Sequence, residues 1–232
     1  MTYWTAGLRT FLSRRVEYCD MDLSRPYTVI CPTLEGPVLD VLAHTTRPLT
    51  GREIARLASR GSERGVRLVL HRLVAQGLVT AREAGSASLY VLNREHVAAG
   101  IVDDLLRLRA ELIDRIRGEV EGWSSPPVNV SIFGSAARAD GHAESDIDLL
   151  IVRPEDLAED DPPWREQLHR LAERIERWSG NHASLHEVSP KGLKAALRRG
   201  EPIIVSLRDT SIVLAGPEIA DLLARRREKA TA

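Results

Sequence analysis

Between residues 35 and 97, apolar positions first recur every three or four residues and then alternate. Three segments have the helical spacing, namely LEGPVLDVLAHT, LTGREIARLAS and ERGVRLVLHRLVAQG. Thr50 and Ser62 stand where N-cap side chains are expected to begin the second and third helices. Two strand-like pieces then flank Gly85 and Ser86, which predicts a β-hairpin. The pattern therefore predicts three helices followed by a hairpin.

Residues 98–123 predict one unbroken helix, because their apolar positions form a single stripe. The stripe consists of Ile101, Leu105, Leu108, Leu112, Ile116 and Val120. A stripe of this kind must be covered, either by the unit before it, by the unit after it, or by a second copy of the chain in a homodimer. Pro126 and Pro127 force an extended backbone after the helix, so we expect a domain boundary near Ser124.

The remaining chain alternates strand-like with helix-like segments, which predicts an α/β domain on a small mixed sheet. Strands are expected at VNVSIF, DIDLLIV and ASLHEVS, and helices at PPWREQLHRLAERIERWSG and PKGLKAALRRG. PIIVSLRDTSIVLAG predicts a strand, a turn and a strand, and Pro217 precedes a last helix. We expect an α+β chain in four parts: an N-terminal extension at 1–34, a helical unit at 35–97, a connecting helix at 98–123 and an α/β domain at 124–232.

The N-terminal extension carries no recognisable chemistry. A short helix is expected within residues 6–18, and YTVIC, between two prolines, is expected to form a strand. Cys19 and Cys31 are the two cysteines of the chain, and two reduced thiols are favoured over a disulfide framework or a metal site. No apolar stretch reaches the roughly 18 residues that a membrane span needs, so we expect a cytoplasmic protein with no membrane partner.

Composition indicates a globular protein, with 43% hydrophobic and 28% charged residues. The net charge of −1 excludes a chain that binds nucleic acid through overall basicity. Any such binding must come from a local patch. Residues 50–99 contain eight arginines and four glutamates, which gives 8 − 4 = +4 and makes this unit the basic part of the chain.

A distinctive pattern lies in FGSAARADGHAESDIDLLIV, where Asp146 and Asp148 precede an apolar run. Alternation in a strand turns both carboxylates to one side and Ile147, Leu149 and Ile151 to the other. Two carboxylates about 5 Å apart repel by roughly 3 kcal/mol at an effective dielectric constant near 20, which a bound cation would offset. Oxygen ligands of this kind suit Mg²⁺ or Mn²⁺.

The turn before this strand has the residue types that hold a phosphate group. Gly134 allows a phosphate to approach the backbone closely, and Ser135 offers a hydroxyl and an N–H group. A helix expected to start at Ala136 would direct its positive end to the same place, and Arg138 would add a guanidinium. The pattern therefore favours phosphoryl chemistry that uses divalent ions.

GSAARADGHAESDIDLLIV resembles the signature of the polymerase β-like nucleotidyltransferases, in which Gly-Ser is followed by ten residues and Asp-x-Asp. The likeness is closest to the minimal bacterial and archaeal members and covers roughly residues 124–216. It implies transfer of NMP from an NTP, with Mg²⁺ or Mn²⁺ bound by Asp146 and Asp148. It also implies nucleotide contacts from four residues of the signature: Gly134, Ser135, Arg138 and Ser145.

One part of the family pattern is missing. Family members usually carry a third carboxylate on the next core strand, where it acts as general base. The matching position in GNHASLHEVS falls near Ser184, and the acid of this segment is Glu187, nominally on the opposite face. A bulge or a different register could bring Glu187 into the site, so Glu187 is the candidate third catalytic residue. His182 and His186 on the same segment are interpreted as structural.

Residues 35–95 resemble the winged helix-turn-helix units of MarR-like regulators, through LTGREIARL, VLHRLVAQGLV and LYVLN. The resemblance implies a recognition helix that presents Arg64, Arg67 and His71 to DNA or RNA. A protein-interaction or dimerisation role remains open for the same unit.

Two functions are therefore in view. The first is a metal-dependent nucleotidyltransferase that modifies a hydroxyl of a protein, an RNA or a small molecule, as minimal members of toxin–antitoxin pairs do. The second is a DNA-binding transcriptional regulator whose nucleotidyltransferase domain senses a nucleotide or is inactive. A third carboxylate within reach of Asp146 would favour the enzyme, and Ser184 alone would favour the sensor.

Overall fold

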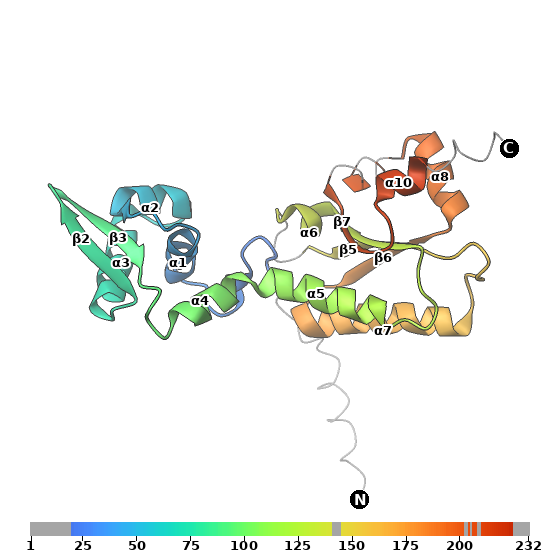
Figure 1. Cartoon of the computed structure of the whole chain (residues 1–232), viewed down its shortest axis with the longest axis horizontal. Helices are drawn as coiled ribbons and strands as arrows, with labels where there is room; N and C mark the ends of the chain where they lie inside the picture. Colours follow the sequence, from blue (N-terminus) through green and yellow to red (C-terminus); the bar gives the residue numbers. More distant parts are fainter. Residues whose placement is uncertain (1–19, 141–144, 202–203, 205, 208–209, 225–232) are drawn as a thin grey trace, which may run out of the picture.

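The computed structural model describes residues 20–140, 145–201, 204, 206, 207 and 210–224. The helix expected within residues 6–18, together with Cys19 and His142, lies outside these residues. The described chain forms two lobes, joined by two consecutive helices (Figure 1). Helix and strand content is mixed and both sheets are small, which agrees with the expected α+β class.

The first lobe is built from residues 35–92. Its elements are α1 (Glu35–Ala43), β1 (Leu49–Thr50), α2 (Gly51–Ala58), α3 (Glu63–Ala75), β2 (Val79–Ala84) and β3 (Ala87–Leu92). The three strands form an antiparallel sheet in the order β1-β3-β2. β2 and β3 make the expected hairpin, with Ala84 paired to Ala87.

Local signals start the helices of this lobe at the expected residues. The Thr50 hydroxyl accepts a hydrogen bond from the Glu53 N–H, and the Glu53 carboxylate accepts one from the Thr50 N–H. The Ser62 hydroxyl accepts one from the Gly65 N–H at the start of α3. The apolar faces then close around a separate core that includes Val38, Leu42, Leu49, Ile54, Val66 and Leu70.

The unbroken helix expected over residues 98–123 is wrong, because the chain forms α4 (Ala99–Leu106) and α5 (Leu108–Glu121) with a break at Arg107. Val102 of α4 packs in the core of the first lobe, whereas Ile116 of α5 packs in the core of the second. The two helices therefore pack into different cores. Ile101, which belongs to the expected apolar stripe, is covered by neither and is 61% exposed.

The second lobe carries a four-stranded mixed sheet in the order β6-β5-β4-β7. The strands are β4 (Asn129–Phe133), β5 (Ile147–Val152), β6 (Ala183–Val188) and β7 (Ile212–Ala215). β5 runs antiparallel to β4 and parallel to β6, and β7 runs antiparallel to β4. The expected strand before β7 is wrong, since the described residues Ile204, Ser206, Leu207 and Thr210 are helical.

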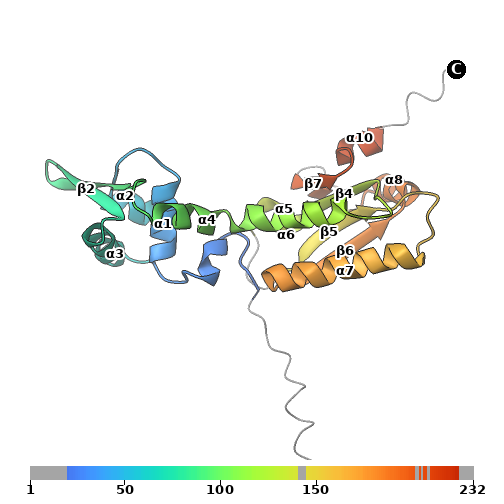
Figure 2. The same cartoon turned by 60° about the horizontal axis from the view of Figure 1, so that its bottom comes forward.

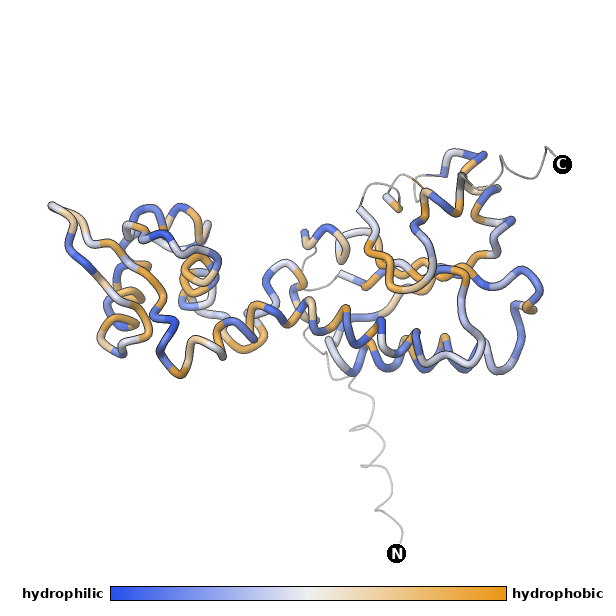
Figure 3. Tube along the Cα trace, in the orientation of Figure 1, coloured by the Kyte–Doolittle hydropathy of each residue, from blue (hydrophilic) through white to orange (hydrophobic). Residues whose placement is uncertain are grey.

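Helices cover both faces of this sheet (Figures 1 and 2). α5 and α7 (Pro162–Ser179) lie along one face, where Trp123 and Trp164 make an edge-to-face contact with ring centroids 5.5 Å apart. α8 (Pro190–Arg199) and α10 (Ile219–Ala224) cover the other face, and α6 (Gly134–Arg138) follows β4. The hydropathy-coloured trace shows the apolar residues of the strands concentrated between these layers (Figure 3).

The beginning of the described N-terminal extension packs on the second lobe. Met21 and Leu23 are buried in the same core as α5 and α7. The Met21 N–H donates to the side-chain oxygen of Asn181, and the Asn181 amide donates to the Met21 carbonyl. The strand expected at YTVIC is wrong, because Pro26–Val29 form a 3₁₀ helix, η1. Cys31 is a free thiol.

Asp22 holds the turn between Leu23 and η1, and its removal should loosen this attachment. Burial alone would raise the pKa of Asp22, but hydrogen bonds from Ser24 and the nearby Arg25 charge outweigh burial and lower it. We expect Asp22→Asn to lower the free energy of unfolding by about 1–3 kcal/mol at neutral pH. Because the folded-state pKa lies below the unfolded value, this difference should be complete above about pH 4 and shrink as the pH falls further.

Urea unfolding of wild type and Asp22→Asn between pH 3 and pH 7 measures this effect. Asp20→Asn is the matched control, two residues earlier in the same segment. An unfolding free energy unchanged by Asp22→Asn at pH 7 would contradict the role assigned to this carboxylate.

Candidate functional site

Asp148 lies on β5, the strand between β4 and β6. Ile147, Leu149 and Ile151 are buried together on the face covered by α5 and α7. Asp148 therefore turns to the opposite face, as the alternation predicted. Asp146 immediately precedes the strand and is exposed, so the carboxylate pair lies at the beginning of β5 rather than within it.

Gly134 brings the turn after β4 directly against Asp148. Phe133, the last residue of β4, is paired with Asp148 across the sheet, so the next residue lies beside that carboxylate. Gly134 has a φ of +66°, and a Cβ atom built there would lie 2.6 Å from Asp148 Oδ2. Only glycine fits both this backbone conformation and this approach. The Gly-Ser turn and the Asp-x-Asp segment therefore meet at Gly134 and Asp148.

Three features of its surroundings shift the pKa of Asp148. Burial raises the pKa of Asp148, the facing His186 lowers it, and repulsion from Asp146 raises it again, with a net upward direction. A cation beside Asp148 would stabilise the ionised carboxylate and would therefore be attracted to this position.

Residues of β6 lie next to Asp148, at the place where the family pattern would put a third carboxylate. The parallel register sets Ser184 beside Asp148, at the place where a third carboxylate was expected. Two residues later on the same face, His186 Nε2 lies 3.7 Å from Asp148 Oδ1 and 3.5 Å from the Ser184 hydroxyl. The His186 ring also packs against Phe133, with centroids 5.3 Å apart.

Glu187 is not brought to Asp148. It is paired with Ile151, three residues further along β5 and on the other face of the sheet. Its carboxylate accepts hydrogen bonds from Arg153 Nε at 2.8 Å, from Trp164 Nε1 at 3.0 Å and from Arg165 at 3.2 Å. β6 has no bulge that would turn Glu187 round, since its register with β5 is continuous over the whole strand. The structure therefore gives no support to Glu187 as the third catalytic residue.

The other predicted nucleotide contacts surround the turn. Ser135 is half-buried in the first turn of α6, which starts at Gly134 rather than at Ala136. Arg138 ends this helix, and its Nε donates to Asp140 at 2.8 Å. Ser145 precedes the carboxylate pair, and its carbonyl accepts a hydrogen bond from the Asn181 amide. Gly134 and Asp148 are in direct contact, whereas Arg138 is engaged with a neighbouring acid.

Residues 113–202 match the family model of a nucleotidyltransferase domain. The match includes the Gly-Ser turn, both aspartates and β6, and it begins within α5. Searches of curated proteins and of solved structures found no significant match. A nucleotidyltransferase domain indicates transfer of a nucleoside monophosphate in general terms. The match does not extend to residues 35–95.

The donor set at Asp148 agrees with the divalent ions that nucleotidyltransferase domains generally use. Among the described residues, no group of three or more His, Cys, Asp or Glu side chains is arranged to hold an ion. Mg²⁺ is usually bound by one or two carboxylates, with water and substrate phosphates completing its shell, so a preassembled cage is not required.

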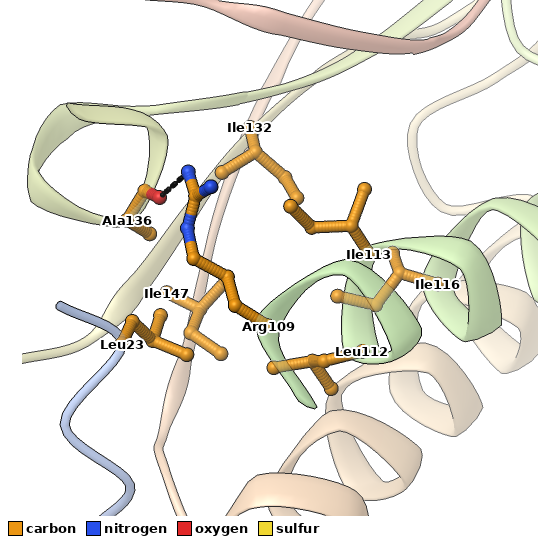
Figure 4. Close-up of a pocket in the computed structure, with 8 residues that line it drawn as sticks. All are labelled: Leu23, Arg109, Leu112, Ile113, Ile116, Ile132, Ala136 and Ile147. Carbon is orange, nitrogen blue, oxygen red and sulfur yellow. Dashed lines mark hydrogen bonds between the residues drawn. The ribbon is translucent and has the colours of Figure 1, made fainter. Parts of the chain in front are cut away.

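Arg109 of α5 was missed by sequence reasoning, and the structure places it against α6, the helix that carries the Gly-Ser turn (Figure 4). Its Nη2 donates to the carbonyls of Ala136 and Ala137 at 2.8 and 2.9 Å, and its Nε is buried without a partner among the described residues. Burial lowers the pKa of this guanidinium. The adjoining cavity measures about 10 Å³, which is too small for a substrate. Arg109 therefore supports α6 from below.

Replacing Arg109 with Met is expected to lower the free energy of unfolding by about 1–3 kcal/mol, because two carbonyls of α6 lose their donor. The same change should weaken NTP binding by loosening the Gly-Ser turn. Urea unfolding and nucleotide titration measure the two effects. Arg107→Met, at the exposed break between α4 and α5, is the control, and equal stability of both variants would argue against this support.

The first lobe presents its predicted nucleic-acid residues on one exposed face of α3. Arg64, Arg67 and His71 are all exposed there. Several other arginines of this lobe form ion pairs, namely Arg47 with Glu53, Arg52 with Glu63, Arg72 with Glu35, and Arg94 with Asp103. Within the described chain, Arg64 and Arg67 have no such acidic partner, so their charges are available to an anionic ligand.

Proposed function

We propose that this protein is a metal-dependent nucleotidyltransferase that moves an NMP from an NTP to a hydroxyl group of a protein, an RNA or a small molecule. The observation that carries the proposal is the contact between Gly134 and Asp148, because it brings the phosphate-binding turn and the carboxylates together. Asp146 and Asp148 would hold Mg²⁺ or Mn²⁺, and the ions would neutralise charge that develops on the phosphates.

The reaction transfers one nucleotidyl group. The acceptor oxygen forms a bond to the α-phosphorus, the bond between the α-phosphorus and the bridging oxygen breaks, and pyrophosphate leaves while the hydroxyl proton passes to solvent. Gly134 and Ser135 would hold the triphosphate against the strand end, and Ser145 would lie beside the same loop. Arg138 would exchange Asp140 for a phosphate oxygen, since both are anionic partners of a guanidinium.

The experiment that tests this proposal uses each α-labelled NTP with Mg²⁺ or Mn²⁺ and a lysate of the source cells. Label on one RNA, protein or small-molecule species, lost in the Asp146→Ala, Asp148→Ala double variant, supports the transferase and names its acceptor. Nucleotide binding without any labelled product contradicts it.

We propose the DNA-binding sensor as the second candidate function, and the placement of β6 residues favours it. Ser184 stands at the register position of the third carboxylate, and Glu187 is engaged on the other face of the sheet. A domain that binds nucleotide without transferring it would fit a regulator.

No helix of the described chain is long and apolar enough to cross a membrane.

The nucleic-acid part of both candidates rests on the first lobe, which we propose to be a winged helix-turn-helix. Its strand order and its three helices agree with such a unit, in which α3 would be the recognition helix. The exposed Arg64 and Arg67, with His71 one turn further on, support binding to phosphates.

We expect Arg64→Ala with Arg67→Ala to weaken binding to duplex DNA or RNA and to reduce the salt dependence by about two units of slope, one for each arginine that no longer reaches a phosphate. Fluorescence anisotropy at several salt concentrations measures this. Arg72→Ala is the control on the same helix, because Arg72 already pairs with Glu35 at 2.7 Å. An unchanged salt slope in the double variant would contradict a nucleic-acid role for this face.

A further inference from the structure

We propose that His186 binds the catalytic metal together with Asp148, in the place of the missing third carboxylate, and that the site therefore prefers Mn²⁺ to Mg²⁺. This inference rests on the proposed function for its choice of site. It concerns a nitrogen ligand, which the Gly-Ser and Asp-x-Asp pattern does not contain.

The position of His186 follows from the register of β6. Ser184 lies beside Asp148, and His186 lies two residues later, so both turn to the same face of the sheet as Asp148. Leu185 and Glu187 turn to the other face, where Leu185 packs against the core under α5 and α7. His186 is thus the side chain of β6 that brings a strong ligand atom to Asp148.

The distance between the two side chains suits a shared ion. A metal about 2.1 Å from each of two ligand atoms sets those atoms about 3 Å apart when they are adjacent in the coordination shell and about 4 Å apart when they are opposite. Asp148 Oδ1 and His186 Nε2 are 3.7 Å apart, which lies within this interval.

The surroundings of His186 orient its ring toward the carboxylate. One side of the ring packs against Phe133, the residue before Gly134, and the Ser184 hydroxyl lies 3.5 Å from Nε2. The side chain is 43% exposed, so it is open to the solvent side from which an ion and a nucleotide arrive. A ring held only for core packing would not need this exposure.

A histidine ligand changes which ion the site selects. Imidazole nitrogen is a common ligand of transition metals, whereas Mg²⁺ is held almost entirely by oxygen. With His186 in the third position, the site should bind Mn²⁺ more tightly than Mg²⁺.

The test uses the full chain and Mn²⁺ alone, without nucleotide. Pulsed electron paramagnetic resonance of bound Mn²⁺ should show coupling to a directly bound ¹⁴N nucleus in the wild type. His186→Gln should lose this coupling and bind Mn²⁺ at least about tenfold more weakly. His182→Gln, an exposed histidine just before β6, should keep both properties.

His186→Asp provides a second variant, whose expected result is a changed metal preference rather than a loss of Mn²⁺ binding. A carboxylate in this position should restore an oxygen-only site and shift the ratio of Mn²⁺ to Mg²⁺ affinity toward Mg²⁺. Absence of bound Mn²⁺ in the wild type, absence of nitrogen coupling, or coupling that persists in His186→Gln would each overturn the proposal.

Failure of this inference and failure of the proposed function give different results. Labelled transfer that depends on Asp148, combined with bound Mn²⁺ lacking nitrogen coupling, leaves the transferase and removes the histidine ligand. Nitrogen coupling without labelled transfer under any condition leaves the metal site and removes the transferase.

Discussion

Asp148→Asn should lower NMP transfer by roughly a thousandfold or more, with little change in the free energy of unfolding. The amide keeps the shape of the side chain but loses the charge that would hold the cation, and a metal contributes several kcal/mol to stabilising phosphoryl charge. Asp148 is partly exposed at the start of β5, so we expect loss of its charge to change the free energy of unfolding little.

Labelled-NTP transfer and urea unfolding, run on the same preparations, measure the two quantities. Asp156→Asn is the matched control, an exposed aspartate beyond the end of β5. Transfer reduced by less than about tenfold in Asp148→Asn would show that the carboxylate does not hold the catalytic ion. Transfer lost together with folding would assign Asp148 a structural role instead.

Gly134→Ala should reduce transfer by about a hundredfold or more, because the new methyl group would displace the Asp148 carboxylate. The Cβ atom would lie 2.6 Å from Asp148 Oδ2, closer than any van der Waals contact, on a backbone with φ of +66°. We expect a loss of about 2–4 kcal/mol in the free energy of unfolding, the sum of left-handed strain and overpacking.

Gly200→Ala separates these two causes. Gly200 has a φ of +67°, and no heavy atom lies within 4 Å of the place that a Cβ atom would take, so its substitution carries the backbone strain without the clash. Gly200→Ala should cost about 1–2 kcal/mol and leave transfer unchanged. Equal transfer by the two variants would show that the approach of Gly134 to Asp148 has no part in the reaction.

Sequence alone predicted most of the local structure that builds the site. The alternation in DIDLLIV determined which residues of β5 are buried, and the structure buries Ile147, Leu149 and Ile151 together. Thr50 and Ser62 begin their helices as expected, because a capping side chain bonds to a backbone group three residues away and needs no distant partner. The Gly-Ser turn and the carboxylates were recognised for the same reason, since their spacing along the chain is short.

Predictions that depended on distant contacts were less successful. The apolar stripe over residues 98–123 predicted one helix, but its two halves pack on different cores and the chain breaks at Arg107. A helical period shows that a face is buried and does not show which partner buries it. Arg109 was missed for a related reason, because its acceptors lie 27 and 28 residues away in α6.

What the sequence determined by itself is the set of chemical groups: a glycine turn, two carboxylates before an apolar strand, and a basic helix in the first lobe. Counting along the chain predicted Ser184 beside them, and only the tertiary structure showed that His186 also approaches Asp148. The parallel register of β5 and β6 is set by packing against α5 and α7, and it places Ser184 and His186 beside Asp148 while turning Glu187 to Arg153. A shift of one residue would reverse these faces. The count along the chain placed Ser184 and Glu187 on the correct faces, but the approach of His186 to Asp148 depends on the pairing between the two strands.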